Sequence, residues 1–215
     1  MRTGPTASPD SSHFERRVAE LRAALSSADP IRLAESTGAR YQIGPGSQNC
    51  FHLPFFGQEV RVSFPEFIAV DPESGKPEPV FDQALLAYYF YTADGTYLAG
   101  RWVSFGELPG GRFYNQAYQG YSGQELSRNF GDDWAGFQTA AQSLGGLPLL
   151  LGDGAFTFQS LPRVPLLAVF WQGDEDFPSS YQILFDASAT HYLPVDVCAI
   201  LGGRLARKLI SARSV

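Results

Sequence analysis

Five carboxylates stand at the ends of predicted strands and could bind a hard cation. Three of them follow the apolar segment 164–171 directly, and the other two end or precede neighbouring strands. Mg²⁺ and Ca²⁺ need several oxygen ligands, so carboxylates that meet at one edge of a sheet form a candidate metal site. The spacing is not that of an EF-hand, and a solvated turn whose carboxylates cap the following backbone amides is the alternative interpretation. The candidate ligands are Asp153, Asp174, Glu175, Asp176 and Asp186.

His191 is the residue that could transfer a proton at such a site. A catalytic base needs a partner within hydrogen-bond distance, and Asp186 lies five residues before it. A histidine with a structural role is the alternative. The chain has no GxSxG, GxGxxG or GxxxxGK[ST] motif, so the sequence does not indicate a serine hydrolase, a dinucleotide-binding protein or a P-loop NTPase.

The segment 113–121 reads FYNQAYQGY and brings several aromatic residues together near tryptophans and arginines. Flat apolar walls with a few polar groups are typical of small-molecule sites. Core packing is one alternative, and an exposed apolar patch that binds another protein is a second. The candidate ligand-binding residues are Arg101, Trp102, Tyr114, Arg163, Trp171 and His191.

A central strand must position these groups. Val164 to Trp171 is almost continuously apolar and too short to span a membrane, which predicts a strand buried on both faces. A second apolar run, Tyr181 to Phe185, follows the acidic turn. We therefore expect segment 164–171 at the centre of the sheet and the acidic turn at its rim.

Three main helices are expected to pack on this sheet. Ser12-x-x-Glu15 matches a capping box and predicts a first helix over about 13–28, and a second apolar segment predicts a helix over 81–91. The last helix begins at Pro194, and its Gly202-Gly203 pair predicts close packing against another backbone, because each glycine costs about 1 kcal/mol there.

The predicted fold class is α+β, with a mixed, mostly antiparallel sheet packed by three main helices. We expect residues 1–12 to form a mobile N-terminal tail and residues 13–215 to form a single domain. A chain of 215 residues can bury about 70% of its unfolded surface, which is enough for a core without disulfides.

Composition excludes several classes of function. The net charge is −6 with only 16 dispersed Lys and Arg residues, which argues against nucleic-acid binding. Cys50 and Cys198 lack metal-ligand spacing, so two buried reduced thiols are expected, with a disulfide as the alternative.

No apolar run is long enough to span a bilayer and no signal-peptide pattern occurs, so we expect a cytoplasmic protein that does not bind membranes.

Several short segments together resemble one known family. They are 101–105 with Leu108-Pro109, 144–146, Leu161-Pro162, the WxGDExFP segment 171–178, and 183–186 leading to Tyr192-Leu193. With these segments the chain resembles an uncharacterised prokaryotic family, the domain of unknown function catalogued as number 3786, from about Tyr41 to Leu209. The resemblance implies that some relatives carry an added cysteine-rich iron–sulfur segment of the kind found in corrinoid proteins. This chain departs from that pattern, because it has only Cys50 and Cys198.

The sequence favours a non-catalytic small-molecule-binding or accessory module, because it contains no nucleophile–base pair, phosphate loop or firm metal motif. One alternative is a metal-dependent enzyme that uses the five carboxylates, with His191 as acid or base. The other is a protein–protein adaptor that uses segment 113–121. The sequence identifies no cofactor, and a small molecule or another protein is the expected partner.

Overall fold

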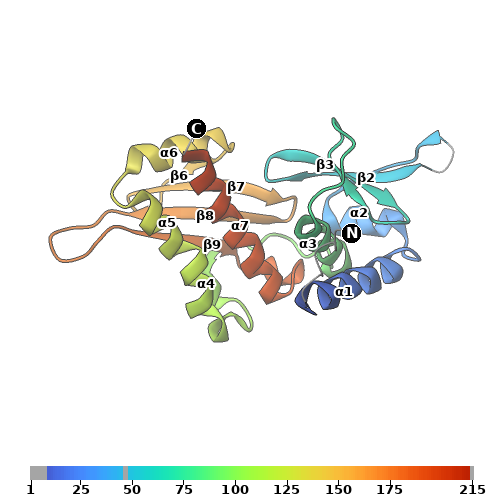
Figure 1. The fold of residues 1–215 in the computed structure, drawn as a ribbon, viewed down its shortest axis with the longest axis horizontal. Helices are drawn as coiled ribbons and strands as arrows, with labels where there is room; N and C mark the ends of the chain where they lie inside the picture. The colour runs from blue at the N-terminus through green and yellow to red at the C-terminus, as the bar shows by residue number, and fades with distance from the viewer. Residues whose placement is uncertain (1–8, 46–47, 214–215) are drawn as a thin grey trace, which may run out of the picture.

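The computed structural model describes residues 9–45 and 48–213, with side chains from residue 15 onward. Two sheets, each covered by helices, make up the fold (Figure 1). One has the strand order β1-β2-β3-β4 and the other β5-β9-β8-β7-β6, and all the paired strands in the described residues are antiparallel. The predicted α+β class is confirmed, but two antiparallel sheets replace the single mixed sheet. Apolar periodicity finds strands without showing which strands pair.

The first sheet and its helices come from the N-terminal part of the chain. Alternate residues of its second strand, Phe51, Leu53 and Phe55, are buried, and the Phe51 ring lies 4.8 Å from the ring of Phe90. The opposite face of the strand carries polar side chains. The elements are α1 Pro9–Leu25, α2 Pro30–Thr37, β1 Arg40–Gln42, β2 Asn49–Phe55, β3 Gln58–Phe64, β4 Ala69–Val70 and α3 Val80–Thr92.

The second sheet has the predicted central strand in the middle position. Strand β8, Val164–Trp171, lies third of five in strand order, and its residues Leu166, Leu167, Ala168 and Val169 are fully buried. This confirms the expectation for segment 164–171. The other strands are β5 Trp102–Ser104, β6 Leu147–Leu149, β7 Gly154–Leu161 and β9 Ser180–Asp186.

Helices from the second half of the chain cover one face of this sheet, and the last helix begins near α3 and runs along that face toward α6 (Figure 1). One hydrophobic cluster includes Phe51 and Phe90 beside the first sheet and Leu166 and Phe185 in the second. The core is therefore continuous between the sheets. These helices are η2 Phe105–Glu107, η3 Gly111–Phe113, α4 Asn115–Tyr121, α5 Gly123–Phe130, α6 Trp134–Ser143, η4 Ala189–His191 and α7 Val195–Arg213.

Helix α1 begins at Pro9, before the predicted start at residue 13. Ser12 therefore lies inside the helix and is not its N-cap, so the predicted capping box was wrong. Proline at the first helical position has the fixed φ angle that a helix needs, which explains the earlier start. Residues 1–8 of the predicted tail lie outside the described residues.

The glycine pair in α7 does mark a close approach, but to side chains and not to a backbone. A Cβ atom at Gly202 would collide with the hydroxyl of Tyr118, and one at Gly203 would lie 2.8 Å from the ring of Tyr121. Both tyrosines belong to α4. The two glycines therefore make room for aromatic rings from the neighbouring helix.

Within the part of the chain that the structure describes, none of the helices is both long enough and apolar enough to cross a membrane.

Candidate functional site

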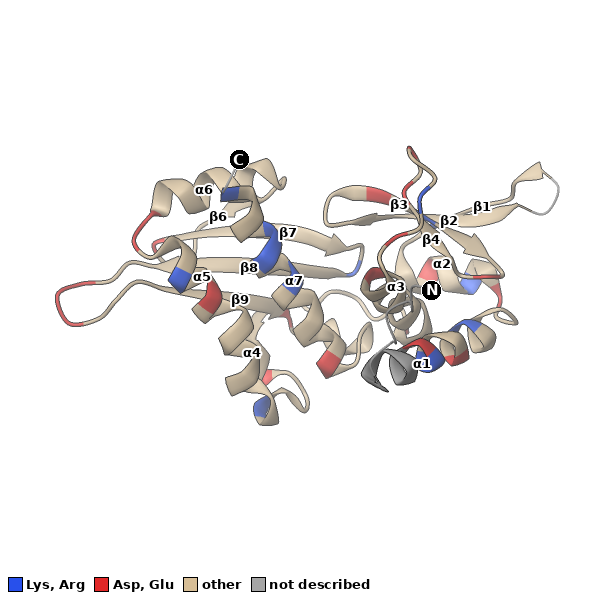
Figure 2. Cartoon of the chain, viewed as in Figure 1, with Lys and Arg blue, Asp and Glu red and all other residues tan. Residues whose placement is uncertain are grey.

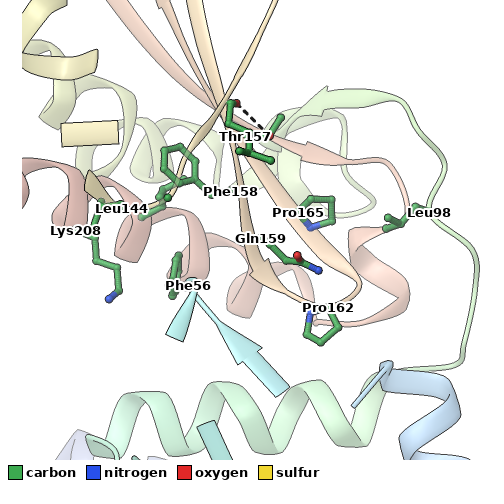
Figure 3. Close-up of a pocket in the computed structure, with 13 residues that line it drawn as sticks. Phe56, Leu98, Leu144, Thr157, Phe158, Gln159, Pro162, Pro165 and Lys208 are labelled. Carbon is green, nitrogen blue, oxygen red and sulfur yellow. Dashed lines mark hydrogen bonds between the residues drawn. The ribbon is translucent and has the colours of Figure 1, made fainter. Parts of the chain in front are cut away.

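A cleft of about 480 Å³ lies where the two sheets meet (Figure 3). The β2–β3 turn forms one wall, strand β7 and the β7–β8 turn form another, and α7 closes the cleft with Leu205 and Lys208. Most of the lining is apolar. The polar side chains in it are those of Thr157, Gln159 and Lys208.

Local backbone geometry creates this cleft. Phe56 and Gly57 form the two-residue β2–β3 turn with φ angles of 50° and 78°, a positive pair that matches the twist of a hairpin. The backbone N–H of Phe56 donates to the carbonyl oxygen of Ser160 at 3.0 Å and fixes the turn against β7. Strand β6 pairs with β7 only as far as Thr157, so β7 beyond that residue is left to line the cleft.

Lys208 supplies the positive charge of the cleft. Burial, and secondly the nearby Arg204, lower the pKa of its ammonium group, while Asp82 and Glu78 act in the opposite direction. Its Nζ lies 5.3 Å from the centre of the Phe56 ring, a cation–π contact. No carboxylate lies within ion-pair distance of Lys208 in the described residues. The ammonium group is therefore partly desolvated without a direct anionic partner.

The six predicted ligand-binding residues do not form one pocket, and none of them lines this cleft. Arg163 and Trp171 lie at opposite ends of β8, while Trp102 lies on β5 at the edge of the sheet. The backbone N–H of Arg163 donates to the Tyr89 hydroxyl at 3.1 Å. The cleft lies at the border of the second sheet, and sequence spacing does not show it because it depends on how β7 meets the β2–β3 turn.

The aromatic segment 113–121 divides between core and surface. Tyr118 is fully buried and stacks on Phe105 at 4.3 Å between ring centres, as the core-packing alternative expected. Phe113 is 91% exposed and Tyr114 57% exposed. The segment therefore supplies no wall of a pocket together with Arg101 and Trp102.

The five candidate metal ligands do not converge. Asp153 and Asp174 lie near the β8–β9 turn, where the backbone N–H of Gln172 donates to Asp153 at 2.8 Å and that of Phe177 donates to Asp174 at 2.9 Å. Figure 2 shows acidic residues at the tip of the long β8–β9 hairpin. Asp186 ends β9 at the opposite end of the strand. No group of three His, Cys, Asp or Glu residues in the described chain could hold a metal ion, so the predicted site has no geometric basis.

Asp186 has a structural role. It is buried, and its carboxylate accepts hydrogen bonds from the backbone N–H groups of Ala99, Gly100 and Ser188 and from the Ser188 hydroxyl. Burial alone would raise the pKa of Asp186, but these hydrogen bonds hold it below its usual value. Asp186 thereby fixes the segment that leads into β5.

His191 does not pair with Asp186, as predicted, but with Asp94. Its Nδ1 lies 2.8 Å from Asp94 Oδ2 and 3.2 Å from the Thr96 hydroxyl. The hydrogen bond to His191 is the main cause that lowers the pKa of Asp94 to about 2. Both side chains are about half exposed. The pair links η4 to the loop after α3, a contact across 97 positions of sequence that spacing does not reveal.

A second polar group lies on the outer face of the first sheet, and the sequence analysis missed it. Cys50 Sγ lies 3.3 Å from His52 Nε2, and His52 Nδ1 lies 2.7 Å from Glu59 Oε1. Cys50 is free and half-buried, so only Cys198 matches the expectation of a buried thiol. The sequence does indicate this group. Alternate residues of a strand share a face, which places Cys50 and His52 together, and the β2–β3 turn sets Glu59 opposite Pro54 on that same face.

The fold defines an α+β protein with two antiparallel sheets and a cleft at their junction. A family model described as Domain of unknown function (DUF3786) matches residues 29–208, and the chain belongs to this family. A search of curated proteins found no match, and a search of solved structures found none either.

Proposed function

We propose that the cleft between the two sheets is a non-catalytic binding site that holds a small amphipathic anion. One observation carries the proposal: Lys208 is partly desolvated at an apolar cleft and has no carboxylate partner among the described residues. An ammonium group in such a place is stabilised by an anionic ligand, because charge-assisted hydrogen bonds are about twice as strong as neutral ones.

The lining sets the chemical class of the ligand. A volume of about 480 Å³ falls inside the usual range for small-molecule sites, about 300–1,000 Å³. Phe56, Phe158 and Leu205 offer apolar contact, while Gln159 and Thr157 can hydrogen-bond a polar group. A monocarboxylate with an aliphatic or aromatic body fits this combination, with its carboxylate at Lys208.

Decanoate is a suitable probe, and decanol, which lacks the charge, is the matched ligand control. Isothermal titration calorimetry should detect decanoate and show weaker binding of decanol. Replacing Lys208 with methionine keeps most of the side-chain volume and should weaken decanoate binding about tenfold or more, because a hydrogen bond to a charged group is lost. The chain contains one other lysine, Lys76, which is exposed and does not line the cleft, so Lys76→Met is the matched control.

Equal affinity of Lys208→Met and wild-type protein for decanoate would refute the role of Lys208. No heat of binding for either ligand would count against the cleft as a monocarboxylate site. Native mass spectrometry of protein purified from its own host is an independent check, because a retained acid would appear as added mass.

As part of this proposal we place the protein in the cytoplasm. Both cysteines are free, which is typical of a reducing compartment. Cell fractionation tests this location directly.

A protein–protein adaptor is the second candidate function, because Phe113 and Tyr114 expose their aromatic rings next to each other in the chain. Exposed aromatic residues are enriched at protein interfaces. If this surface binds a second copy, light scattering should show a dimer at high concentration, and Phe113→Ser with Tyr114→Ser should abolish it. A wild-type protein that stays monomeric at all concentrations argues against self-association.

A further inference from the structure

Cys50, His52 and Glu59 form a connected hydrogen-bonding group that is separate from the cleft. Cys50 and His52 lie two residues apart on β2 and so share its outer face, and Glu59 comes from β3, where it pairs with Pro54. The two heavy-atom distances, 3.3 Å from Sγ to Nε2 and 2.7 Å from Nδ1 to Oε1, place the imidazole between thiol and carboxylate. The side chain of Arg40 approaches the same carboxylate oxygen of Glu59 at 3.9 Å.

The order of these groups determines which ring nitrogen carries the proton. An ionised carboxylate can only accept hydrogen bonds, so the nitrogen that faces Glu59, Nδ1, is the one that carries hydrogen. In the neutral imidazole, Nε2 is then an acceptor, and it faces the Cys50 thiol. Glu59 therefore orients His52 as a base for Cys50, which is the nucleophile–base–orienter arrangement of covalent catalysis.

The thiol is also partly exposed, and it shares a pocket with the cationic side chain of Arg61 and the acidic side chain of Glu66. Cys50 lines a surface pocket of about 520 Å³ together with Arg61 and Ser63. Arg61 pairs across the strands with His52, it is exposed, and its side chain has no ion pair within the described residues. Reactive cysteines are typically partly exposed and have a cationic group nearby, and Arg61 is such a group here. The guanidinium group can donate to an anion that forms beside the sulfur.

Other uses of this thiol do not fit the geometry. Cysteine and glutamate bind different nitrogens of one imidazole, so the three residues cannot surround one metal ion, and the described chain contains no metal-binding group of three such residues. Disulfide exchange within the chain needs a second accessible thiol, but Cys198 is fully buried in α7. Acyl transfer needs only a nucleophile, a base and an oxyanion donor.

We propose that Cys50 is an acyl-accepting nucleophile with His52 as its base, Glu59 as a positioning residue, and an activated ester or thioester as its substrate class. His52 Nε2 takes the thiol proton while Sγ forms a bond to the carbonyl carbon. The bond from that carbon to the leaving alkoxide or thiolate then breaks, and His52 returns the proton to the leaving group. The product is an S-acyl cysteine, which water hydrolyses to a carboxylic acid and the free thiol.

p-Nitrophenyl acetate is the probe for this step. Wild-type protein should release one equivalent of p-nitrophenolate rapidly, and peptide mapping should locate one acetyl group on Cys50. His52→Gln should slow the acetylation about 100-fold, the usual contribution of a general base. Cys198→Ala is the matched control and should react like the wild type, because Cys198 is buried and burial raises the pKa of its thiol.

Glu59 is tested at an exposed position, where substitution leaves the core intact. Glu59→Gln should slow acetylation by at least about tenfold at an unchanged melting temperature, and Glu59→Asp should restore part of the rate. The proposal is overturned if acetyl groups do not reach Cys50 in the wild type, or if His52→Gln and Glu59→Gln both react as fast as the wild type. Decanoate binding at the cleft does not depend on these residues, so the two proposals fail independently.

Discussion

Loss of one partner of the ion pair between Asp82 of α3 and Arg204 of α7 should destabilise the fold strongly. Asp82 is 1% exposed and accepts a hydrogen bond from Arg204, whose side chain is 27% exposed. Burial raises the pKa of Asp82, whereas Arg204 and Lys208 lower it without cancelling the effect. Asp82 Oδ1 and Arg204 Nε have no hydrogen-bond partner in the described residues. The pair is therefore buried but incompletely satisfied.

Replacing Asp82 with alanine leaves the guanidinium of Arg204 without its carboxylate. Removal of one partner from a buried pair costs about 3–5 kcal/mol, and the partial exposure of Arg204 places this case near about 3 kcal/mol. Urea unfolding at pH 7, followed by circular dichroism, measures the change in the free energy of unfolding. Glu20→Ala breaks an exposed pair with Arg17 and should leave the urea midpoint nearly unchanged.

The pH dependence of the free energy of unfolding distinguishes the effect of the Asp82 charge from the effect of its side-chain shape. Folding raises the pKa of Asp82, so the folded state binds the Asp82 proton more tightly than the unfolded state does. The stability gained from this proton is present below pH 3.8 and is lost as the pH rises through the raised pKa of the folded state. Wild-type stability relative to Asp82→Asn should therefore increase as pH falls toward 4. A cost below about 1 kcal/mol for Asp82→Ala, or a difference from Asp82→Asn that is independent of pH, would refute this reasoning.

Three further predictions concern single residues. The hydrogen bond from His191 lowers the pKa of Asp94 to about 2, so the stability that Asp94 contributes is present above pH 3.8 and is lost as the pH falls toward 2. When unfolding is followed against falling pH, the Asp94→Asn variant should not show this loss of stability. Gly202→Ala should cost about 1–2 kcal/mol in urea unfolding, because overpacking against Tyr118 exceeds the gain in helix propensity, whereas Gly120→Ala meets open space and should stabilise. Asp186→Ala should cost more than about 2 kcal/mol by the same assay, since four hydrogen bonds are lost.

The strands that sequence predicted best are those with the strongest apolar pattern. Segment 164–171 is buried in the middle of its sheet, as its nearly continuous apolar run predicted. Which strands pair depends on contacts between distant segments, so the division into two sheets could not be derived from periodicity.

Two errors at the candidate sites were avoidable. Asp174 precedes β9 and Asp186 ends it, and at about 3.4 Å per residue a strand of this length separates its ends by roughly 20 Å. Strand geometry alone therefore places these carboxylates apart. Strand alternation likewise places Cys50 and His52 together on one face of β2, opposite the face that carries Phe51 and Leu53. The cleft, by contrast, depends on a turn from one sheet that touches a strand of the other.

Helix α7 contacts α3, α4, α5, α6 and β9, yet it follows all of them in the chain. A ribosome therefore releases the other helices and both sheets before the element that joins them. Until α7 emerges, the face of Tyr118 that packs on Gly202 is uncovered, and nascent chains with exposed apolar surfaces are prone to aggregate. A chaperone that shields the growing polypeptide would act on this protein before α7 has been made.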